Sequence, residues 1–241
     1  MRILITNDDG IRAEGLIPLV RWAKKLGEVT VIAPKFEQSG KSHGIEILKC
    51  FEAKQVELDP GVEAWAVDST PADCVRFAVL GLNREFDLVI SGINRGLNIG
   101  CDIMYSGTVA AVFEASALGI KSIAVSTEPK YYSQAVQHMD AIYDFLIRHE
   151  LHTKNDIYNV NIPENPGTIR ITRQGGPFFS DEFEPRENDM FMPIGKNVYR
   201  PSGDENLDTD AVLTYRNISV TPLTINRTSP DVYRELVKLN S

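Results

Sequence analysis

The chain has 241 residues, 43% of them hydrophobic and 24% charged, and a formal net charge of -8 at pH 7. This length suits one large domain with a sizeable core. Without a Lys/Arg cluster, an acidic chain lacks the basic face needed to bind nucleic-acid polymers or anionic membranes. Three widely spaced cysteines without a C-x-x-C pair argue against a disulfide framework and a cysteine zinc site.

The N-terminus and the apolar runs give an expectation about location. Arg2 and the acidic pair near the start leave no apolar stretch long enough for a signal peptide. No stretch reaches the roughly 20 apolar residues that a membrane span requires. We therefore expect a cytoplasmic protein that does not bind membranes.

Predicted strands and helices alternate through the first half of the chain. A strand, a helix and a second strand within the first 34 residues form a βαβ unit, which predicts a parallel sheet. Short apolar runs predict buried strands, helical spacing predicts helices, and alternation predicts further strands around a turn. The predicted strands are 2–6, 28–34, 86–92 and 121–127, the helices 15–27, 69–82, 108–119 and 133–149, and the alternating segment 45–68 with its turn at 59–61.

The second half of the chain differs in texture. Residues 157–241 combine short strand-like runs with many prolines and polar turns, such as "IPENPG" and "FEPREND". We expect a Rossmann-like α/β layer sandwich in which residues 1–150 form the core and carry the site. Residues 151–241 would continue the same domain as a β-rich C-terminal arm for subunit contact.

Two adjacent aspartates, Asp8 and Asp9, follow the first predicted strand in "RILITNDDG". Asp-Gly is a common turn pair and acidic residues favour helix N-termini, so a turn or capping role is one interpretation. However, two neighbouring carboxylates repel each other unless a cation or an extra proton relieves the repulsion. Oxygen ligands suit Mg²⁺ or Mn²⁺, so the pair predicts one divalent cation.

Other polar residues are expected at the same edge of the sheet, because ligands bind beyond the carboxyl ends of parallel strands. Ser39 follows the second predicted strand, and Asn94 and Asn98 follow "DLVISG". Ser39 and Asn94 are ordinary loop residues by themselves, but each offers a neutral oxygen to a cation. His43, four residues after Ser39, is the only histidine expected near the site.

The helix predicted from residue 108 begins just after Ser106 and Gly107. A helix N-terminus presents unpaired N–H groups and a partial positive charge, so Ser106, Gly107 and Thr108 form a candidate phosphate cradle. A plain Ser/Thr cap with nothing bound is the alternative. The neighbouring "SGINRGLNIG" is neither a G-x-G-x-x-G fingerprint nor a P-loop, so a dinucleotide or an NTP-driven machine is poorly supported.

Five segments in order resemble the SurE family of survival-protein nucleotidases. They are "ILITNDDG", "APKFEQSGKSHGI", "STPADCV", "DLVISGINRGLNIGCDIMYSGTVAA" and "SVTPL", and they extend to about residue 223. The resemblance implies a metal-dependent phosphatase acting on nucleoside 5′- or 3′-monophosphates, with some activity on short polyphosphate. It also implies a homodimer or homotetramer built through an exchanged C-terminal arm.

The resemblance also assigns roles to individual residues. Carried over by position, Asp8 and Asp9 would be metal-binding and catalytic residues, with Ser39 and Asn94 completing the metal ligands. The phosphate contacts would be Asn98, Ser106, Gly107 and Thr108. The mechanism we expect is metal-assisted hydrolysis of a phosphomonoester, in which Asp8 or Asp9 also orients the attacking water.

Three alternatives come from other classes. Phosphatases that form an aspartyl phosphate end their first strand with D-x-D-G, but Asn7 stands where that nucleophile would be and cannot serve. A receiver-like signalling module needs an aspartate at a later strand end, whereas "DLVISG" ends in Ser91 and Gly92. A nucleotide-binding protein without catalysis is the third alternative, and only an assay separates it from an enzyme.

Overall fold

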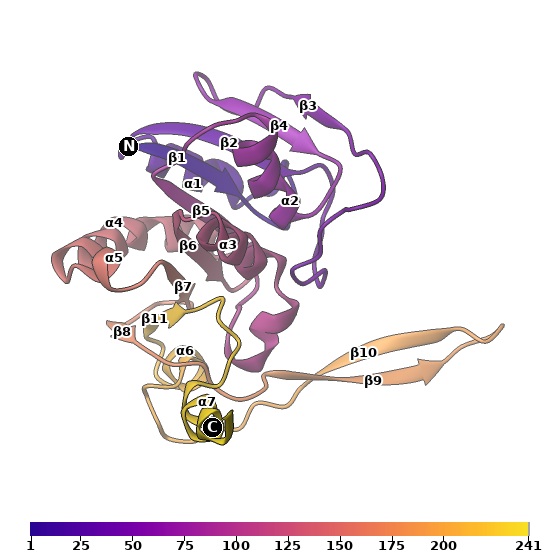
Figure 1. The fold of residues 1–241 in the computed structure, drawn as a ribbon, viewed down its shortest axis with the longest axis vertical. Coiled ribbons are helices and arrows are strands. Elements are labelled where there is room, and N and C mark those ends of the chain that lie inside the picture. Colours follow the sequence, from indigo (N-terminus) through magenta and orange to yellow (C-terminus); the bar gives the residue numbers. More distant parts are fainter. Residues whose placement is uncertain (241) are drawn as a thin grey trace.

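The computed structural model describes residues 1–240 and has one large sheet. Its strands, from one edge to the other, lie in the order β3-β4-β2-β1-β5-β6-β7-β11-β8 (Figure 1). Their bounds are β1 Arg2–Thr6, β2 Glu28–Pro34, β3 Ala53–Gln55, β4 Glu63–Val67, β5 Leu88–Arg95, β6 Lys121–Thr127, β7 Ile157–Ile162, β8 Ile169–Ile171 and β11 Ile218–Leu223.

The direction in which the strands are added reverses at the centre of the sheet. β1 pairs in parallel with both β2 and β5. The chain runs outward from β1 through β2 to β4, and then returns to the other side of β1 for β5, β6 and β7. The connections after β1 and β5 therefore diverge, and in doubly wound sheets ligands bind at this point. The predicted α/β fold is confirmed.

Helices cover both faces of the sheet. α1 (Leu16–Ala23) and α4 (Tyr132–Arg148) pack on one face, and α2 (Pro71–Arg76) and α3 (Gly107–Ala117) on the other. Within β1, Ile3 and Ile5 join the first of these cores and Leu4 joins the second, as the alternation of a strand requires. Both faces of β1 are buried, which explains its continuous apolar run.

The C-terminal third continues the sheet and adds a projecting hairpin. β7 pairs in parallel with β6, whereas β11 runs antiparallel to β7. The hairpin consists of β9 (Phe179–Pro185) and β10 (Phe191–Asn197) and extends away from the body of the molecule (Figure 1). Short helices α5 (Leu151–Lys154), α6 (Asp208–Leu213) and α7 (Pro230–Leu236) complete this part.

The predicted strands at 45–52 are wrong, because β3 begins only at Ala53. The carboxylate of Glu46 accepts hydrogen bonds from the backbone N–H groups of Leu48 (2.8 Å) and Lys49 (3.0 Å). Such local side-chain bonds compete with strand pairing. The turn predicted at 59–61 is confirmed by the hydrogen bond from the Val62 N–H to the Asp59 carbonyl (3.1 Å).

Several predicted boundaries also differ. Helix α1 ends at Ala23 because the next residues form tighter turns, and α2 ends at Arg76, where a π-helical turn replaces it. β5 reaches Arg95, so the predicted loop 93–107 begins inside a strand and also contains a 3₁₀ helix, Gly100–Tyr105. Helices α6 and α7 were not predicted in the β-rich part.

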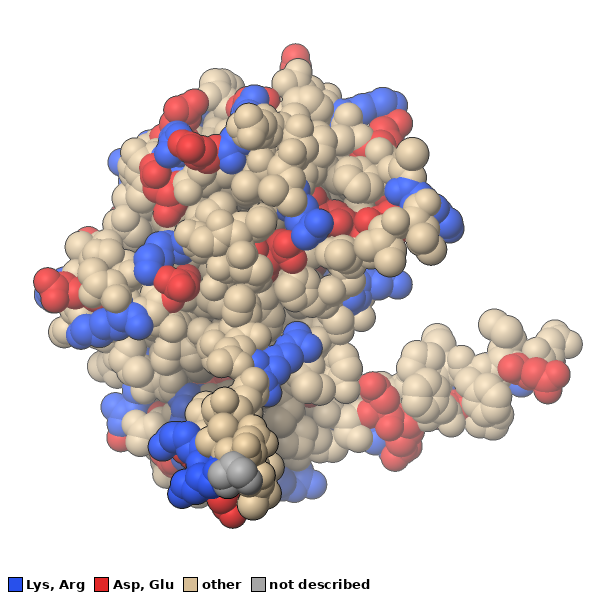
Figure 2. Space-filling view, in the orientation of Figure 1, with Lys and Arg blue, Asp and Glu red and all other residues tan. Residues whose placement is uncertain are grey.

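The surface fits the acidic composition. Figure 2 shows Lys and Arg side chains interspersed with Asp and Glu over the visible face, without a continuous basic area. Among residues 1–240, no helix is both long and apolar enough to cross a membrane.

Candidate functional site

A hydrogen-bonded turn ends β1 and presents the two aspartates. The Asn7 side chain donates to the Gly10 carbonyl (2.9 Å) and accepts from the Gly10 N–H (3.1 Å). Gly10 has a φ of 99°, a conformation that favours glycine. Asn7, which replaces the nucleophile of the D-x-D-G pattern, is therefore a structural residue that fixes where Asp8 and Asp9 lie.

Asp8 is buried against the N-terminus of α3. Its carboxylate accepts a hydrogen bond from the Thr108 hydroxyl, and the residue is 4% exposed. A Cβ at Gly107 would lie 2.8 Å from the Asp8 Cβ, so only glycine lets the helix approach this closely. Burial raises the pKa of Asp8, and the hydroxyl and N–H of Thr108 partly oppose that shift.

Asp9 lies beside Asp8 and is only partly buried. One of its carboxylate oxygens accepts a hydrogen bond from the Arg95 N–H (2.8 Å) at the end of β5. Burial is the main reason why the pKa of Asp9 is raised to about 6; the Arg95 N–H lowers it and the Asp8 charge raises it further. A cation bound beside Asp9 would offset both the burial of its carboxylate and the repulsion from Asp8.

The loop after β2 is tied to the same edge. The Gln38 N–H donates to the Asp8 carbonyl (2.7 Å), and the Glu37 carboxylate pairs with the Arg95 guanidinium (3.1 Å). Ser39 is exposed, and its hydroxyl donates to Glu37 Oε1 (2.7 Å). The structure thus connects the loops after β1, β2 and β5, as the sequence predicts.

Asn94 is the last but one residue of β5, where it is 9% exposed. Its side-chain nitrogen donates to the Gly96 carbonyl (2.9 Å). Within residues 1–240 no hydrogen bond engages Asn94 Oδ1, so this oxygen is available to a cation. The expected loop position of Asn94 is corrected to a strand end.

Asn98 is held by the neighbouring strands and not by the aspartates. Its N–H donates to Asn161 Oδ1 (2.8 Å), and its carbonyl accepts from the side-chain amides of Asn159 (2.8 Å) and Asn161 (2.9 Å). Its own amide donates to Ser126 Oγ (2.8 Å). This set of contacts, the asparagine clamp, fixes both the backbone and the side chain of Asn98.

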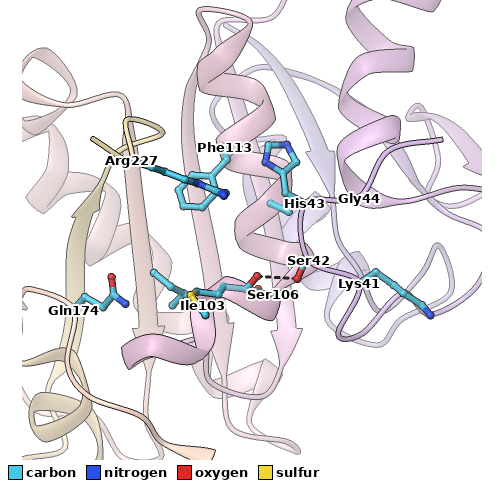
Figure 3. A pocket seen from close by; sticks show the side chains of 11 residues that line it. Lys41, Ser42, His43, Gly44, Ile103, Ser106, Phe113, Gln174 and Arg227 are labelled. Atoms are coloured by element: carbon cyan, nitrogen blue, oxygen red, sulfur yellow. Dashed lines mark hydrogen bonds between the residues drawn. The ribbon is translucent and has the colours of Figure 1, made fainter. Parts of the chain in front are cut away.

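Ser106 caps helix α3. Its hydroxyl oxygen accepts a hydrogen bond from the Val109 N–H (3.1 Å), which leaves the hydroxyl proton free to donate. Ser106 also lines a cavity of about 620 Å³ on the side of α3 (Figure 3). The hydroxyl and N–H of Thr108 form hydrogen bonds with Asp8. The donors at the helix N-terminus are therefore divided between this carboxylate and the candidate phosphate cradle.

Comparison with known proteins assigns the family. Residues 3–181 match the family model described as survival protein SurE. The chain belongs to the SurE family. It is 36% identical over 256 residues to a 5′-nucleotidase SurE from Rhodopirellula baltica, covering 100% of this chain and 99% of that one.

Two further SurE relatives agree. A 5′-nucleotidase SurE from Thermosipho melanesiensis is 36% identical over 252 residues, covering 98% of this chain and 96% of the relative. The crystal structure of the SurE protein from Aquifex aeolicus superposes with a TM-score of 0.81 at 30% identity, and each chain is covered to 100%. The predicted family is confirmed, and the expectation of a phosphomonoester hydrolase agrees with the names of these relatives.

The donor set of this SurE chain fits a hard divalent cation. Two desolvated carboxylates lie side by side, and the free oxygen of Asn94 and the exposed hydroxyl of Ser39 belong to adjoining segments. No group of three or more His, Cys, Asp or Glu side chains that could hold a metal occurs among the described residues. A cation here would therefore depend on Asp8, Asp9 and neutral oxygens, and not on a dense acidic cluster.

Sequence reasoning did not identify several residues of the site. The Arg95 N–H, which holds Asp9, has no side-chain signal. Asn159 and Asn161 had one, because two fully buried asparagines in "YNVNIP" are unusual in a core strand. Glu114, whose carboxylate lies 2.8 Å from His43 Nε2, also had one, since a carboxylate within the Ala-rich α3 is unusual at a buried position.

Proposed function

We propose that this SurE chain hydrolyses nucleoside monophosphates to a nucleoside and inorganic phosphate, as a 5′-nucleotidase. The observation that carries the proposal is the contact between Asp8 and the first residues of α3, Gly107 and Thr108. It places a carboxylate pair suited to a cation directly beside a helix N-terminus suited to a phosphate. The 5′-nucleotidase names of the relatives support the same substrate class.

The cation site consists of Asp8, Asp9, Ser39 and Asn94, and it takes one divalent ion, Mg²⁺ or Mn²⁺. When bound, such an ion neutralises phosphate oxygens and lowers the pKa of a coordinated water. Asp8, held by the Thr108 hydroxyl, keeps a fixed geometry. Asp9 is anchored through one oxygen to the Arg95 N–H, so the other oxygen can accept a hydrogen bond from the attacking water.

The phosphate lies against Ser106, Gly107, Thr108 and Asn98. A water oxygen attacks phosphorus while the P–O bond to the nucleoside breaks, and the departing oxygen takes up a proton. Charge develops on the phosphoryl oxygens, and preorganised donors at the α3 terminus stabilise it. The asparagine clamp keeps the Asn98 amide in place without reorganisation during the reaction.

Finer features of the activity also belong to the proposal. Because the phosphate is held at the end of α3, we propose that the enzyme also accepts 3′-monophosphates and the terminal phosphate of short polyphosphate. We propose that the enzyme works in the cytoplasm and acts on small molecules, not on nucleic-acid polymers or membranes. The interspersed charges of Figure 2 support the exclusion of broad polyanion binding.

We propose that the chain forms a homodimer or homotetramer through its C-terminal arm. In the hairpin register Phe183 pairs with Pro193 and Phe191 with Pro185, so these side chains share one face of the ribbon. Phe183 is 67% exposed and Phe191 is 62% exposed. An exposed aromatic face on a projecting ribbon suits burial against a second copy.

The test is release of inorganic phosphate from 5′- and 3′-nucleoside monophosphates, p-nitrophenyl phosphate and tripolyphosphate, each with EDTA, Mg²⁺ or Mn²⁺. We expect release that requires the metal and is fastest with nucleotides. If no phosphate is released with Mg²⁺ and none with Mn²⁺, the proposed hydrolysis is contradicted. The non-catalytic alternative would then predict that a nucleotide raises the melting temperature without being consumed.

A further inference from the structure

The cavity beside Ser106 has no role in the phosphoryl chemistry described above. Its volume of about 620 Å³ lies within the range of small-molecule sites, roughly 300–1,000 Å³. Phe113 and Ile103 contribute apolar surface, and His43 and Arg227 contribute polar groups (Figure 3). Apolar walls with a few convergent polar groups are typical of ligand pockets.

One wall of the cavity is the side of α3. Ser106, Ala110 and Phe113 line it, and their spacing of four and three residues places them on one face of the helix. At 1.5 Å per residue, this wall runs about 10 Å from the phosphate end to Phe113. A nucleoside attached to a phosphate at Ser106 has a comparable length, so it can lie along this wall.

His43 is held firmly at the far end of that wall. Its Nε2 lies 2.8 Å from Glu114 Oε2, and Arg76 donates to Glu114 Oε1 at 3.0 Å. The hydrogen bond from His43 is the main reason why the pKa of Glu114 is lowered, and Arg76 adds to it. An ionised carboxylate only accepts hydrogen bonds, so Nε2 donates to Glu114 and Nδ1 is left to bond a ligand.

The backbone on both sides of His43 is also pinned. The Ser42 N–H donates to the Tyr105 carbonyl (3.1 Å), and the Ser42 hydroxyl donates to the Met104 carbonyl (2.9 Å). On the other side, the Thr70 hydroxyl donates to the Gly44 carbonyl (2.7 Å). His43 is therefore preorganised although it belongs to a loop, and no hydrogen bond among residues 1–240 engages its Nδ1.

We propose that this cavity holds the nucleoside part of the substrate and that His43 is a specificity-determining residue. The imidazole Nδ1 forms a hydrogen bond with a sugar hydroxyl or a polar atom of the base, and Phe113 offers its apolar surface to the same moiety. The rings of His43 and Phe113 lie 6.3 Å apart, at one end of the cavity (Figure 3). This inference rests on the proposed nucleotidase function and adds where the leaving nucleoside is recognised.

Substitutions at His43 distinguish the role of Nδ1 from that of Nε2. An asparagine at position 43 keeps a polar atom near the place of Nδ1, whereas a glutamine keeps one near Nε2 and the contact with Glu114. We expect His43→Gln and His43→Ala to lower kcat/KM for AMP about ten-fold, mainly through KM, because one hydrogen bond to the substrate is lost. His43→Asn should retain more activity, and glycerol phosphate, which lacks a nucleoside, should be hydrolysed at nearly the wild-type rate by all three variants.

The control is His138→Ala, the same chemical change on α4, with thermal melting to show that each variant is folded. Equal losses on AMP and glycerol phosphate would overturn the proposal, since His43 would then act on the phosphoryl group. Unchanged kcat/KM for AMP in His43→Gln would overturn it as well.

Binding of adenosine, measured by saturation-transfer NMR in EDTA, keeps this inference separate from the proposed catalysis. We expect wild-type protein to bind adenosine and His43→Gln to bind it about ten-fold more weakly. If the wild type hydrolyses nothing but shows this difference, the nucleotidase proposal fails and the cavity assignment stands. Equal binding by both proteins, or no binding by the wild type, would overturn the cavity assignment.

Discussion

Two regions, the edge of the sheet at β1 and the hairpin of β9 and β10, each destabilise the isolated chain, but for opposite reasons. The first buries the carboxylate of Asp8 and partly buries that of Asp9, although water would solvate both better. The second exposes Phe183 and Phe191, which would be more stable when buried. Each region is therefore suited to a partner of its own chemistry, a cation with a phosphate at the first and a second copy at the second.

The difference teaches where function and assembly are encoded. The carboxylate pair is placed by the core, since Asn7 and Gly10 form the turn and α3 packs against Asp8. Phe183 and Phe191 are mostly exposed, and the face that they share follows from the strand register of the hairpin. Substitutions in the two regions should therefore have separable effects, on catalysis in one case and on oligomeric state in the other.

The largest effect is expected from Asp9→Asn. Removing the charge should lower the rate of phosphate release about 100-fold or more, since charge stabilisation of that order is lost at a preorganised site. In EDTA the same variant should melt at a higher temperature than wild type, because it no longer desolvates a carboxylate beside Asp8. Phosphate release and differential scanning fluorimetry measure the two results.

The matched control is Asp144→Asn, which removes an exposed carboxylate from α4. It should change neither the rate nor the melting temperature. A fully active Asp9→Asn variant would contradict the cation site, and a lower melting temperature in EDTA would contradict the idea that the pair is strained without a cation.

A second effect is expected from the double substitution Phe183→Ser with Phe191→Ser. It removes the aromatic face of the hairpin and should convert the proposed oligomer to monomer, while most of the activity is retained. Multi-angle light scattering gives the molar mass. Leu80→Ser, at an exposed apolar position elsewhere, should leave the mass unchanged. An oligomer that survives the double substitution would place the interface elsewhere.

The sequence allowed good predictions where local pattern and topology agree. The run Ile3, Leu4 and Ile5 is buried on both faces, so its apolar continuity predicted β1. Once the sheet was predicted to be parallel, Asp8, Asp9 and Ser39 followed at its carboxyl edge. Ser106 was predicted just before a helix, with a capping role as one interpretation, and its hydroxyl accepts the capping bond from the Val109 N–H.

Long-range partners account for what could not be predicted. Asn94 resembles a loop residue because glycines surround it, but β5 resumes its pairing with β6 there after a register shift. The clamp on Asn98 joins residues 61 and 63 positions apart in the chain. The contact between Glu114 and His43 spans 71 positions. No local pattern specifies such pairs, although buried polar residues in core elements indicate that partners exist.

The asparagine clamp sharpens the comparison, because it is a buried polar contact that is already satisfied. Asn161→Ala should lower kcat about ten-fold by releasing Asn98, and should destabilise the fold by about 1–3 kcal/mol through unpaired backbone groups. The control, Ser219→Ala, removes a buried hydroxyl that has no partner among residues 1–240. It should be neutral or stabilising in urea unfolding, and equal destabilisation by both variants would contradict the clamp.

The smallest effect concerns Glu114 and the pH dependence of stability. Contact with His43 lowers the pKa of Glu114 below its ordinary value of 4.5 in the folded chain, so the carboxylate stabilises the fold above that pH. This contribution is lost as the pH falls through the folded pKa, where folded and unfolded states are both protonated. The melting temperature of wild type should therefore exceed that of Glu114→Gln at pH 6, and the difference should shrink as the pH falls below 4.5. A difference that is the same at pH 6 and in acid would mean that the glutamine disturbs packing, not the ion pair.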